Sequence, residues 1–393
     1  MRSRLFLLLS VLWGSSYCVF GQDSVSLEEL RQRPISNVQG EAGNLLRQWW
    51  KEGTAAGNIG DWYDNRDREH SPFKLDLYPQ LQKIKYTPAD NKADRNWGLQ
   101  PKVLPLVVFG NSSTSGLPNL NGSNVRIYYT MPGGLDLLQQ QYLRNNLYIY
   151  PEHRDYDPGR SDVGGGYGDL YPTNTPYLIT SQGSSYTDQP FMQAVAMTMA
   201  AFRPEVKKKL IETGLLMPTI QMVFRSSNKQ VRKAEDYFTG SAHPPVFEGT
   251  QVDLPRMLKL AHSLQVDSLP PAIKLDVVEE DRVRPGADYF EAPGLTETLG
   301  NTVSVIARVF RGRQKERRMV VRVRDSLDLN GRPLTFRWVL LRGDEGRVSI
   351  KTKDAKGTEA EIKVDYQERR PIAPGSPMET NRVDIGVFAH NGV

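Results

Sequence analysis

Cysteine is almost absent from this chain of 393 residues, and the only one, Cys18, lies near the N-terminus. The first 21 residues begin with two arginines, continue with a mostly apolar stretch from Leu5 to Trp13 and end with small residues at the cleavage positions before Gln22. This order is typical of a secretory signal peptide, so we expect the mature chain to begin at Gln22. Removal of Cys18 would leave no disulfide, no cysteine nucleophile and no cysteine-based metal site.

Long apolar runs are also absent. The apolar part of the leader is too short and wrongly flanked to span a membrane, and no later segment approaches the ~18 consecutive apolar residues that a span needs. We therefore expect an exported protein without a transmembrane segment, secreted or periplasmic, and export argues against nucleic acid as a partner. Lipid attachment at Cys18 is the alternative, although Tyr17 stands where a small residue is usual before a lipidated cysteine.

The composition, 39% hydrophobic and 24% charged, is that of a folded globular protein, and the length after the leader is enough for two domains. Charge is unevenly placed along the chain. Thr298–Val393 carries 19 basic and 12 acidic residues, whereas residues 22–297 carry 29 and 33. The C-terminal region is therefore the basic part of the protein.

The C-terminal region shows apolar residues at alternate positions, in short runs. Turn dipeptides such as Asn330-Gly331 and Arg342-Gly343 separate these runs, and a segment rich in Pro and Gly, residues 283–300, precedes them. The pattern predicts an antiparallel β-sandwich over residues 291–393, with residues 283–300 as its linker. The clearest runs are Met319, Val321 and Val323; Phe336, Trp338 and Leu340; and Val383, Ile385 and Val387.

Within this region, the stretch DSLDLNGRPLTFRWVLLRGDEG, residues 325–346, resembles the PKD-type immunoglobulin-like domain. It has the Asp-rich turn, Pro-Leu-Thr, an aromatic residue and a Trp on the next strand. The resemblance covers roughly the last quarter of the chain and implies an Ig-like sandwich. Arg332 stands where many such domains have an acidic residue, which argues against calcium at this turn. A further strand is implied after VDIGVFAHNGV, so we expect either an exposed edge strand or a truncated chain, and favour truncation.

The preceding region, residues 22–290, mixes the helical and the strand period. Its alternation of strands and helices predicts an α/β domain with a mixed sheet. Its overall pattern looks like an uncharacterised family of exported bacterial proteins, a resemblance that implies no activity and no site residues. Helices are expected over residues 42–56, 134–145, 189–202 and 204–214, and buried strands over residues 103–109, 147–150 and 176–180.

A first candidate site is the stretch DWYDNRDREH, residues 61–70, which concentrates acidic residues around His70. Asp61, Asp64 and His70 are candidate ligand-binding residues. The stretch also resembles the start of a calcium loop, but His70 stands where the sharp turn needs Gly, and Asp76 where a bidentate Glu is usual. We prefer a solvent-facing loop whose aspartates cap backbone N–H groups.

A second candidate site follows the strand LYIY, where Glu152, His153 and Asp155 come in close succession. Side chains at the end of a buried strand are held by a rigid scaffold and are open to solvent, which is where α/β sheets place ligands. These three residues are our candidate catalytic residues. The two carboxylates suit general acid–base work, or a divalent metal together with His153. The alternative is a polar loop whose side chains hydrogen-bond only with one another.

A third candidate site lies between PYLIT and the helix that begins near Pro190. Ser184 and Ser185 and the backbone N–H groups of this loop could hold an anionic group, although helix capping by Thr187 or Asp188 is the preferred role of those two residues. If the sheet is parallel, this loop, the loop after LYIY and the loop that follows VLPLVVF, with Asn111, all open on one edge.

The basic run RGRQKERR, residues 311–318, is predicted to form a hairpin in the C-terminal region. Arg311 and Arg313 are candidate binding residues for acidic polysaccharide or an anionic cell surface, and a solvated hairpin tip is the alternative. Of the remaining histidines, His243 is expected to lie in a turn, and His262 on a helix, where a structural role is more common than a ligand role.

These features together predict an exported two-domain protein that binds or processes an extracellular glycan-like ligand, with a PKD-like domain for attachment. The alternative is an envelope or matrix interaction protein without chemistry. Convergence of Asp61, Asp64, His70, Glu152, His153 and Asp155 in one pocket would favour the first interpretation, whereas scattered and individually paired side chains would favour the second.

Overall fold

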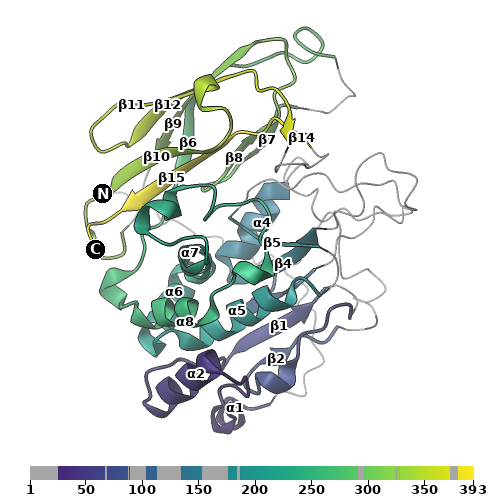
Figure 1. Ribbon diagram of the computed structural model, residues 1–393, viewed down its shortest axis with the longest axis vertical. Helices are drawn as coiled ribbons and strands as arrows, with labels where there is room; N and C mark the ends of the chain where they lie inside the picture. The colour runs from purple at the N-terminus through teal and green to yellow at the C-terminus, as the bar shows by residue number, and fades with distance from the viewer. Residues whose placement is uncertain are drawn as a thin grey trace, which may run out of the picture.

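The structure, a computed structural model, places helices around a parallel sheet at one end of the molecule and antiparallel sheets at the other (Figure 1). It describes residues 25–66, 69–86, 88, 103–112, 134–152, 176–183, 186–290, 296–323, 326, 328–371 and 379–393. None of the helices in these ranges is long and apolar enough to cross a membrane.

The parallel sheet has the strand order β2-β1-β3-β4-β5, and every neighbouring pair is parallel. Val108, Phe109, Leu147 and Ile179 are fully buried, as expected for a sheet covered on both faces. An α/β domain is thus confirmed, although the sheet is parallel and not mixed within the described strands. Its strands are β1 (Asp61–Asn65), β2 (Gln82–Lys83), β3 (Val107–Asn111), β4 (Asn146–Glu152) and β5 (Ile179–Gln182).

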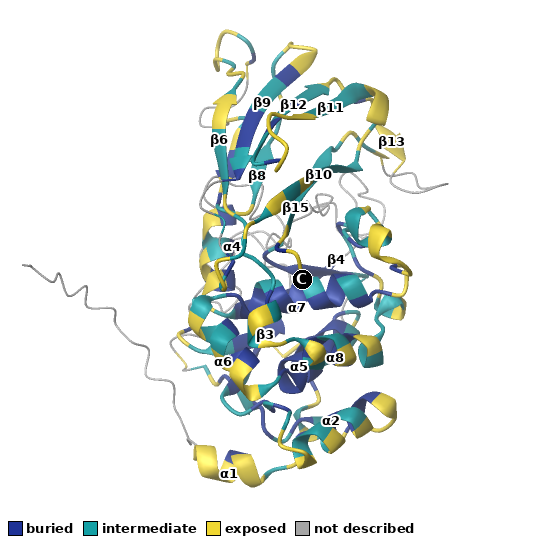
Figure 2. Cartoon of the chain, turned by 90° about the vertical axis from the view of Figure 1, so that its left-hand side faces the viewer, coloured by how far each residue is buried: buried dark blue, intermediate teal, exposed yellow. Residues whose placement is uncertain are grey.

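The helices confirm the four predicted from the sequence. Pro204 starts α6, and Gly214 ends it in the left-handed conformation with φ 69°, where its N–H bonds to carbonyls of the last turn. Figure 2 shows α5 and α7 as deeply buried helices. The helices are α1 (Leu27–Gln32), α2 (Glu41–Lys51), α4 (Gly134–Leu143), α5 (Gln189–Ala201), α6 (Pro204–Thr213), α7 (Leu216–Ser227) and α8 (Leu254–Ser263).

The C-terminal region is antiparallel, as predicted, and contains a four-stranded sheet of order β11-β12-β9-β6 and three strand pairs, β10-β15, β7-β8 and β13-β14. These strands are β6 (Leu275–Glu280), β7 (Thr298–Asn301), β8 (Ile306–Arg308), β9 (Glu316–Val323), β10 (Thr335–Arg342), β11 (Val348–Thr352), β12 (Glu359–Asp365), β13 (Arg370–Pro371), β14 (Glu379–Thr380) and β15 (Asp384–His390).

The antiparallel region begins earlier than the predicted linker, residues 283–300, because β6 lies before that segment and pairs with β9. The change from helices to antiparallel strands therefore falls between α8 and β6. Two side-chain amides tie the C-terminal region to the chain just before β6: Asn330 Nδ2 lies 3.2 Å from the Asp267 carbonyl oxygen, and Asn391 Nδ2 lies 3.4 Å from that of Leu269.

The four-stranded sheet and the β10-β15 pair of the C-terminal region differ in burial. Val320 and Val321 of β9 and Ala360 of β12 are buried, whereas no residue of β10 or β15 is buried (Figure 2). Apolar side chains such as Trp338 and Ile385 are thus only half-covered. They line a large cavity.

Candidate functional site

The carboxyl ends of β1, β3, β4 and β5 lie on one edge of the sheet, because all of their pairings are parallel. The prediction that the loops after VLPLVVF, LYIY and PYLIT open on one edge is therefore confirmed for the point where each strand ends. The chain adds β2 on one side of β1 and β3 on the other, so the order in which the strands are added reverses between β1 and β3 while all of them stay parallel. Such a switch point is where open α/β sheets bind ligands.

The stretch DWYDN is strand β1 and not a solvent-facing loop, so that part of our prediction was wrong. Asp61, at the start of β1, lies 2.7 Å from Lys207 Nζ, and both side chains are almost fully buried. Asp64 accepts hydrogen bonds from the hydroxyls of Tyr86 and Tyr148, both at 2.6 Å. Aspartates are unusual in a strand, but here their charges and lone pairs are satisfied in the interior.

A cluster of polar groups lies where β1 and β3 end. We call Asn65, Ser71, Asn111, Asp188 and Gln189 the edge cluster. Asn111 Nδ2 donates to the carbonyl oxygens of His70 and Ser71, at 3.2 and 3.3 Å. Asn65 Nδ2 also donates to the His70 carbonyl, at 3.1 Å. The two strand ends thus hold the segment that follows β1 against the sheet edge.

The segment after β1 is joined to the start of α5 through Ser71. The Ser71 hydroxyl donates to Asp188 Oδ1 and accepts the backbone N–H of Tyr186 at 3.0 Å. Gln189 Nε2 donates to the Ser71 carbonyl at 3.0 Å and to the Pro72 carbonyl at 2.8 Å. Two segments that are distant in sequence, the one after β1 and the one at the start of α5, therefore meet at the Ser71 hydroxyl group.

Asp188 is the least satisfied member of the edge cluster. Its side chain is buried, and Oδ2 has no hydrogen-bond partner within the described part of the chain. Burial raises the pKa of Asp188 to about 6, and the hydrogen bond from Ser71 opposes this rise. Asp188 occupies the N-cap position of α5 but makes no side-chain cap hydrogen bond there, so capping by Asp188, one of the two residues for which we preferred that role, was wrong.

Backbone strain concentrates around the edge cluster. Glu69, Ser71 and Tyr186 have backbone φ angles of 66°, 49° and 73°, values that residues other than glycine rarely adopt. The Tyr186 side chain is 63% exposed although its backbone is held by Ser71. Strained residues persist where the surrounding contacts determine them, and they gather at functional sites.

Among the described residues, Asp61 and Asp64 are individually paired in the interior and His70 is exposed, an arrangement that we expected of an interaction protein without chemistry. The other predicted site residues are distributed as follows. Asn111 belongs to the edge cluster, whereas His70 contributes only its carbonyl oxygen and exposes its side chain. Glu152 ends β4, in register with Gln182 of β5. His153, Asp155, Ser184 and Ser185 lie outside the described residues. No group of three side chains suited to hold a metal is found within the described residues.

The basic run RGRQKERR is not a hairpin, because β8 pairs with β7 while β9 pairs with β6 and β12. Its last two arginines are already in ion pairs: Arg317 Nη2 lies 2.6 Å from Glu297, and Arg318 lies 2.8 Å from Glu279 and 2.7 Å from Glu361. Arg311 is half-exposed and Arg313 exposed.

His243 and His262 both have structural contacts, as expected for His262. His243 bonds through Nε2 to the Tyr237 carbonyl oxygen at 2.8 Å, and burial lowers its pKa to about 3. The His262 ring stacks on Trp49, with ring centres 4.0 Å apart.

Ser71, Tyr186 and Gln189 were missed by the sequence analysis. They belong to no motif, and 117 residues separate Ser71 from Asp188. A positive φ angle is usually signalled in a sequence by glycine. Because Ser71 and Tyr186 are not glycines, their backbone conformation could not be predicted from the sequence. Comparison with known proteins gives no further guide: no family model, no curated protein and no solved structure matches this chain.

Proposed function

We propose that this is an exported protein whose α/β domain binds an extracellular glycan-like ligand at the carboxyl edge of its parallel sheet. The observation that carries the proposal is the exposed ring of Tyr186, held in a strained conformation beside the buried polar groups of the edge cluster. The rest of the proposal, the PKD-like identity of the C-terminal sheets and their role in attachment, follows from the resemblance of residues 325–346.

The chemistry of the edge suits a sugar. An exposed aromatic ring offers a flat apolar face, against which the C–H face of a sugar ring can pack. Amides and a carboxyl group beside it can bond hydroxyl groups, and Gln189 is a half-buried amide at the start of α5. A few fixed polar groups next to an aromatic surface are the usual composition of a small-ligand site.

Cleavage of the bound glycan is the second candidate function. Glu152 is the last residue of β4 and therefore belongs to the same edge of the sheet. With His153 and Asp155 it could provide general acid and base groups, or bind a divalent metal. A recognition protein without chemistry is the alternative, and it would share the binding but not the cleavage.

Binding and cleavage are tested together on a panel of neutral and acidic polysaccharides, with and without divalent metal. We expect one polysaccharide to retard the protein in affinity electrophoresis and Tyr186→Ala to weaken that binding at least tenfold. Tyr366→Ala is the matched control, because Tyr366 is 61% exposed but lies beyond β12 in the antiparallel region. If the natural protein also releases new reducing ends and Glu152→Gln does not, the protein cleaves the glycan as well as binding it.

The opposite results are equally clear. Equal losses in Tyr186→Ala and Tyr366→Ala would place binding elsewhere, and binding of no polysaccharide would contradict the proposal. Binding that survives in Arg311→Gln and Arg313→Gln would exclude the basic run as the main glycan site.

A further inference from the structure

A second site is suggested by Arg225, a buried cation of α7. Its side chain is only 6% exposed. Nη1 donates to the Ala242 carbonyl oxygen at 3.1 Å and Nη2 to Gln221 Oε1 at 3.3 Å. A guanidinium has five N–H donors and stays protonated in proteins, so these two neutral acceptors leave most of its donors and its whole charge unmatched.

Comparison with the other buried cations shows how unusual Arg225 is. Four Lys or Arg residues are buried in the described part of the chain, and three of them have a carboxylate within 2.9 Å: Arg66 with Asp64, Lys207 with Asp61 and Arg317 with Glu297. Of these four buried cations, Arg225 is the one without an ion pair among the described residues. Its Cζ lies 5.0 Å from the Phe247 ring centre, and this cation–π contact is worth less than the loss of hydration that burial imposes.

Two tyrosines extend the polar surface around Arg225. Tyr142 of α4 and Tyr237 line the same cavity as the guanidinium. Burial raises the pKa of both hydroxyls, and the nearby charge of Arg225 opposes this rise. Both hydroxyls are therefore neutral at physiological pH and can donate hydrogen bonds, so they cannot neutralise Arg225 but can join it in binding an oxyanion.

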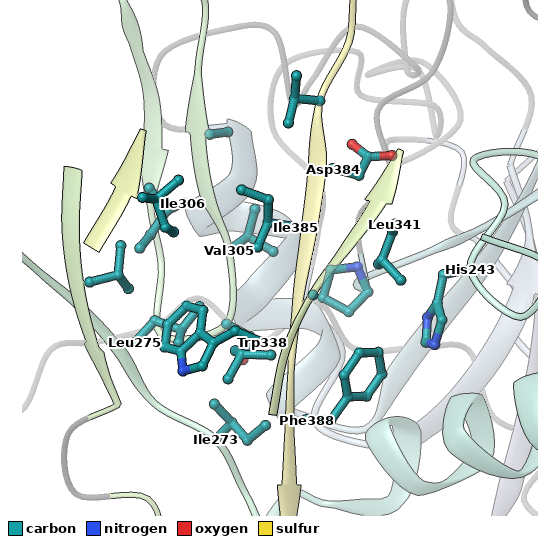
Figure 3. A pocket seen from close by; sticks show the side chains of 18 of the residues that line it. His243, Ile273, Leu275, Val305, Ile306, Trp338, Leu341, Asp384, Ile385 and Phe388 are labelled. Atoms are coloured by element: carbon teal, nitrogen blue, oxygen red, sulfur yellow. The ribbon is translucent and has the colours of Figure 1, made fainter. Parts of the chain in front are cut away.

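The rest of the cavity is lined by apolar side chains, among them Val305, which packs against the main core, and by charged ones such as Glu297 and Arg308. It has a volume of about 2950 Å³ and extends from α7 to the space between β8 and β15. Figure 3 shows the side chains of Val305, Ile306 and Ile385 at one end and those of Ile273 and Trp338 at the other. All five are half-exposed, which is costly for apolar groups unless something covers them.

The aromatic ring of Phe388 connects the polar and the apolar parts of the cavity. It belongs to β15, and its ring centre lies 5.6 Å from that of Tyr237 and 5.2 Å from that of His243. The carboxylate of Asp384, also in the lining, accepts a hydrogen bond from Arg382 Nε at 2.6 Å through Oδ1, and its Oδ2 forms an ion pair with Arg342 Nε at 3.5 Å. It therefore does not compensate Arg225.

We propose that this cavity binds an anionic amphiphile, with its oxyanion head on Arg225, Tyr142 and Tyr237 and its apolar chain against β8, β10 and β15. An anionic group would pair with Arg225, and a hydrocarbon chain would bury the half-exposed apolar lining. The volume exceeds the ~300–1,000 Å³ of ordinary small-ligand pockets, so an extended chain has room. This site is separate from the edge cluster and does not depend on the glycan proposal.

The test is calorimetric titration of the full protein with dodecanoate, dodecanol and inorganic phosphate, each below its aggregation limit. We expect dodecanoate to bind at least tenfold more tightly than dodecanol or phosphate, and to change the fluorescence of Trp338. Arg225→Gln should reduce dodecanoate affinity at least tenfold. The matched control is Arg337→Gln, because Arg337 is exposed, stacks over Phe238 at 4.5 Å and does not line the cavity.

Two milder variants keep the proposal testable if Arg225→Gln fails to fold. Tyr237→Phe removes one donor and should weaken dodecanoate but not dodecanol, whereas Ile385→Gln should weaken both. Equal affinity for dodecanoate and dodecanol, phosphate binding as tight as dodecanoate, or no binding at all would overturn the proposal. A dimer that dissociates in Ile385→Gln would also overturn it, by assigning the cavity to a second copy of the chain.

Discussion

At the scale of single residues, buried charged groups fall into two kinds: structural groups whose partners lie within the protein, and groups that lack a partner and are candidates for binding a ligand. Asp61 and Asp64 have full sets of partners in the interior, which is what a structural role requires. Asp188 has one unpartnered oxygen and a raised pKa, and Arg225 has no counter-charge within the described residues. A bound ligand could supply the hydrogen bond that Asp188 lacks or the counter-charge that Arg225 lacks.

Asp188 should make stability depend on pH. Its folded pKa of about 6 exceeds the unfolded value of about 3.9, so the folded state binds the proton more tightly. The resulting stabilisation, up to about 3 kcal/mol, is present below pH ~4 and is lost as the pH rises through ~6. We therefore expect Asp188→Asn to gain about 1–2 kcal/mol over the natural chain at pH 7.5 and nothing at pH 4. Thermal unfolding across this range measures it, and an equal change at every pH would contradict the assignment.

The ion pair of Asp61 and Lys207 should be essential for folding. Lys207→Ala leaves a buried carboxylate without its cation, a change that costs about 3–5 kcal/mol. The exposed pair of Lys259 and Glu41 is the control, where Lys259→Ala should change stability by less than about 1 kcal/mol. Urea denaturation compares the two, and similar small losses would mean that Asp61 is hydrated and available to a ligand.

At the scale of elements, local signals predicted helices such as α5 and α6 and the antiparallel strands, but not α1, α7 or β1. Pro204 and Gly214 mark both ends of α6, and alternation marks β9 and β10. The strand β1 carries two aspartates and an asparagine, so its sequence has the composition of a turn. It is a strand because Lys207, Tyr86 and Tyr148 reach it from distant parts of the chain.

The pairing of β1 with β3 should depend on Gly110. A Cβ built there would lie 1.9 Å from the Asp64 carbonyl oxygen, in the strand that Gly110 faces. Gly110→Ala should therefore cost at least about 3 kcal/mol and disrupt the sheet edge. Gly346→Ala is the control, since its nearest neighbour would be 3.4 Å away. Thermal unfolding that barely changes in Gly110→Ala would show that the strands can separate without loss.

At the scale of the whole molecule, the sequence could predict an α/β part followed by an antiparallel part, but not which side chains meet. Asn111 was found because it follows a strand, and every strand of a parallel sheet ends on one edge. Ser71 was not found, because its partners Tyr186 and Asp188 lie more than a hundred residues further along the chain. Polar contacts across more than a hundred residues depend on the final packing, and no local pattern encodes them.

Hydrogen–deuterium exchange of the protein, free and bound to the tightest polysaccharide of the panel, tests the central claim most directly. The account predicts that binding slows exchange in residues 69–73 and 186–189, which surround Ser71 and Asp188, and leaves β9 to β15 unchanged. Slower exchange confined to the antiparallel sheets would contradict it, and would make those sheets the site of recognition.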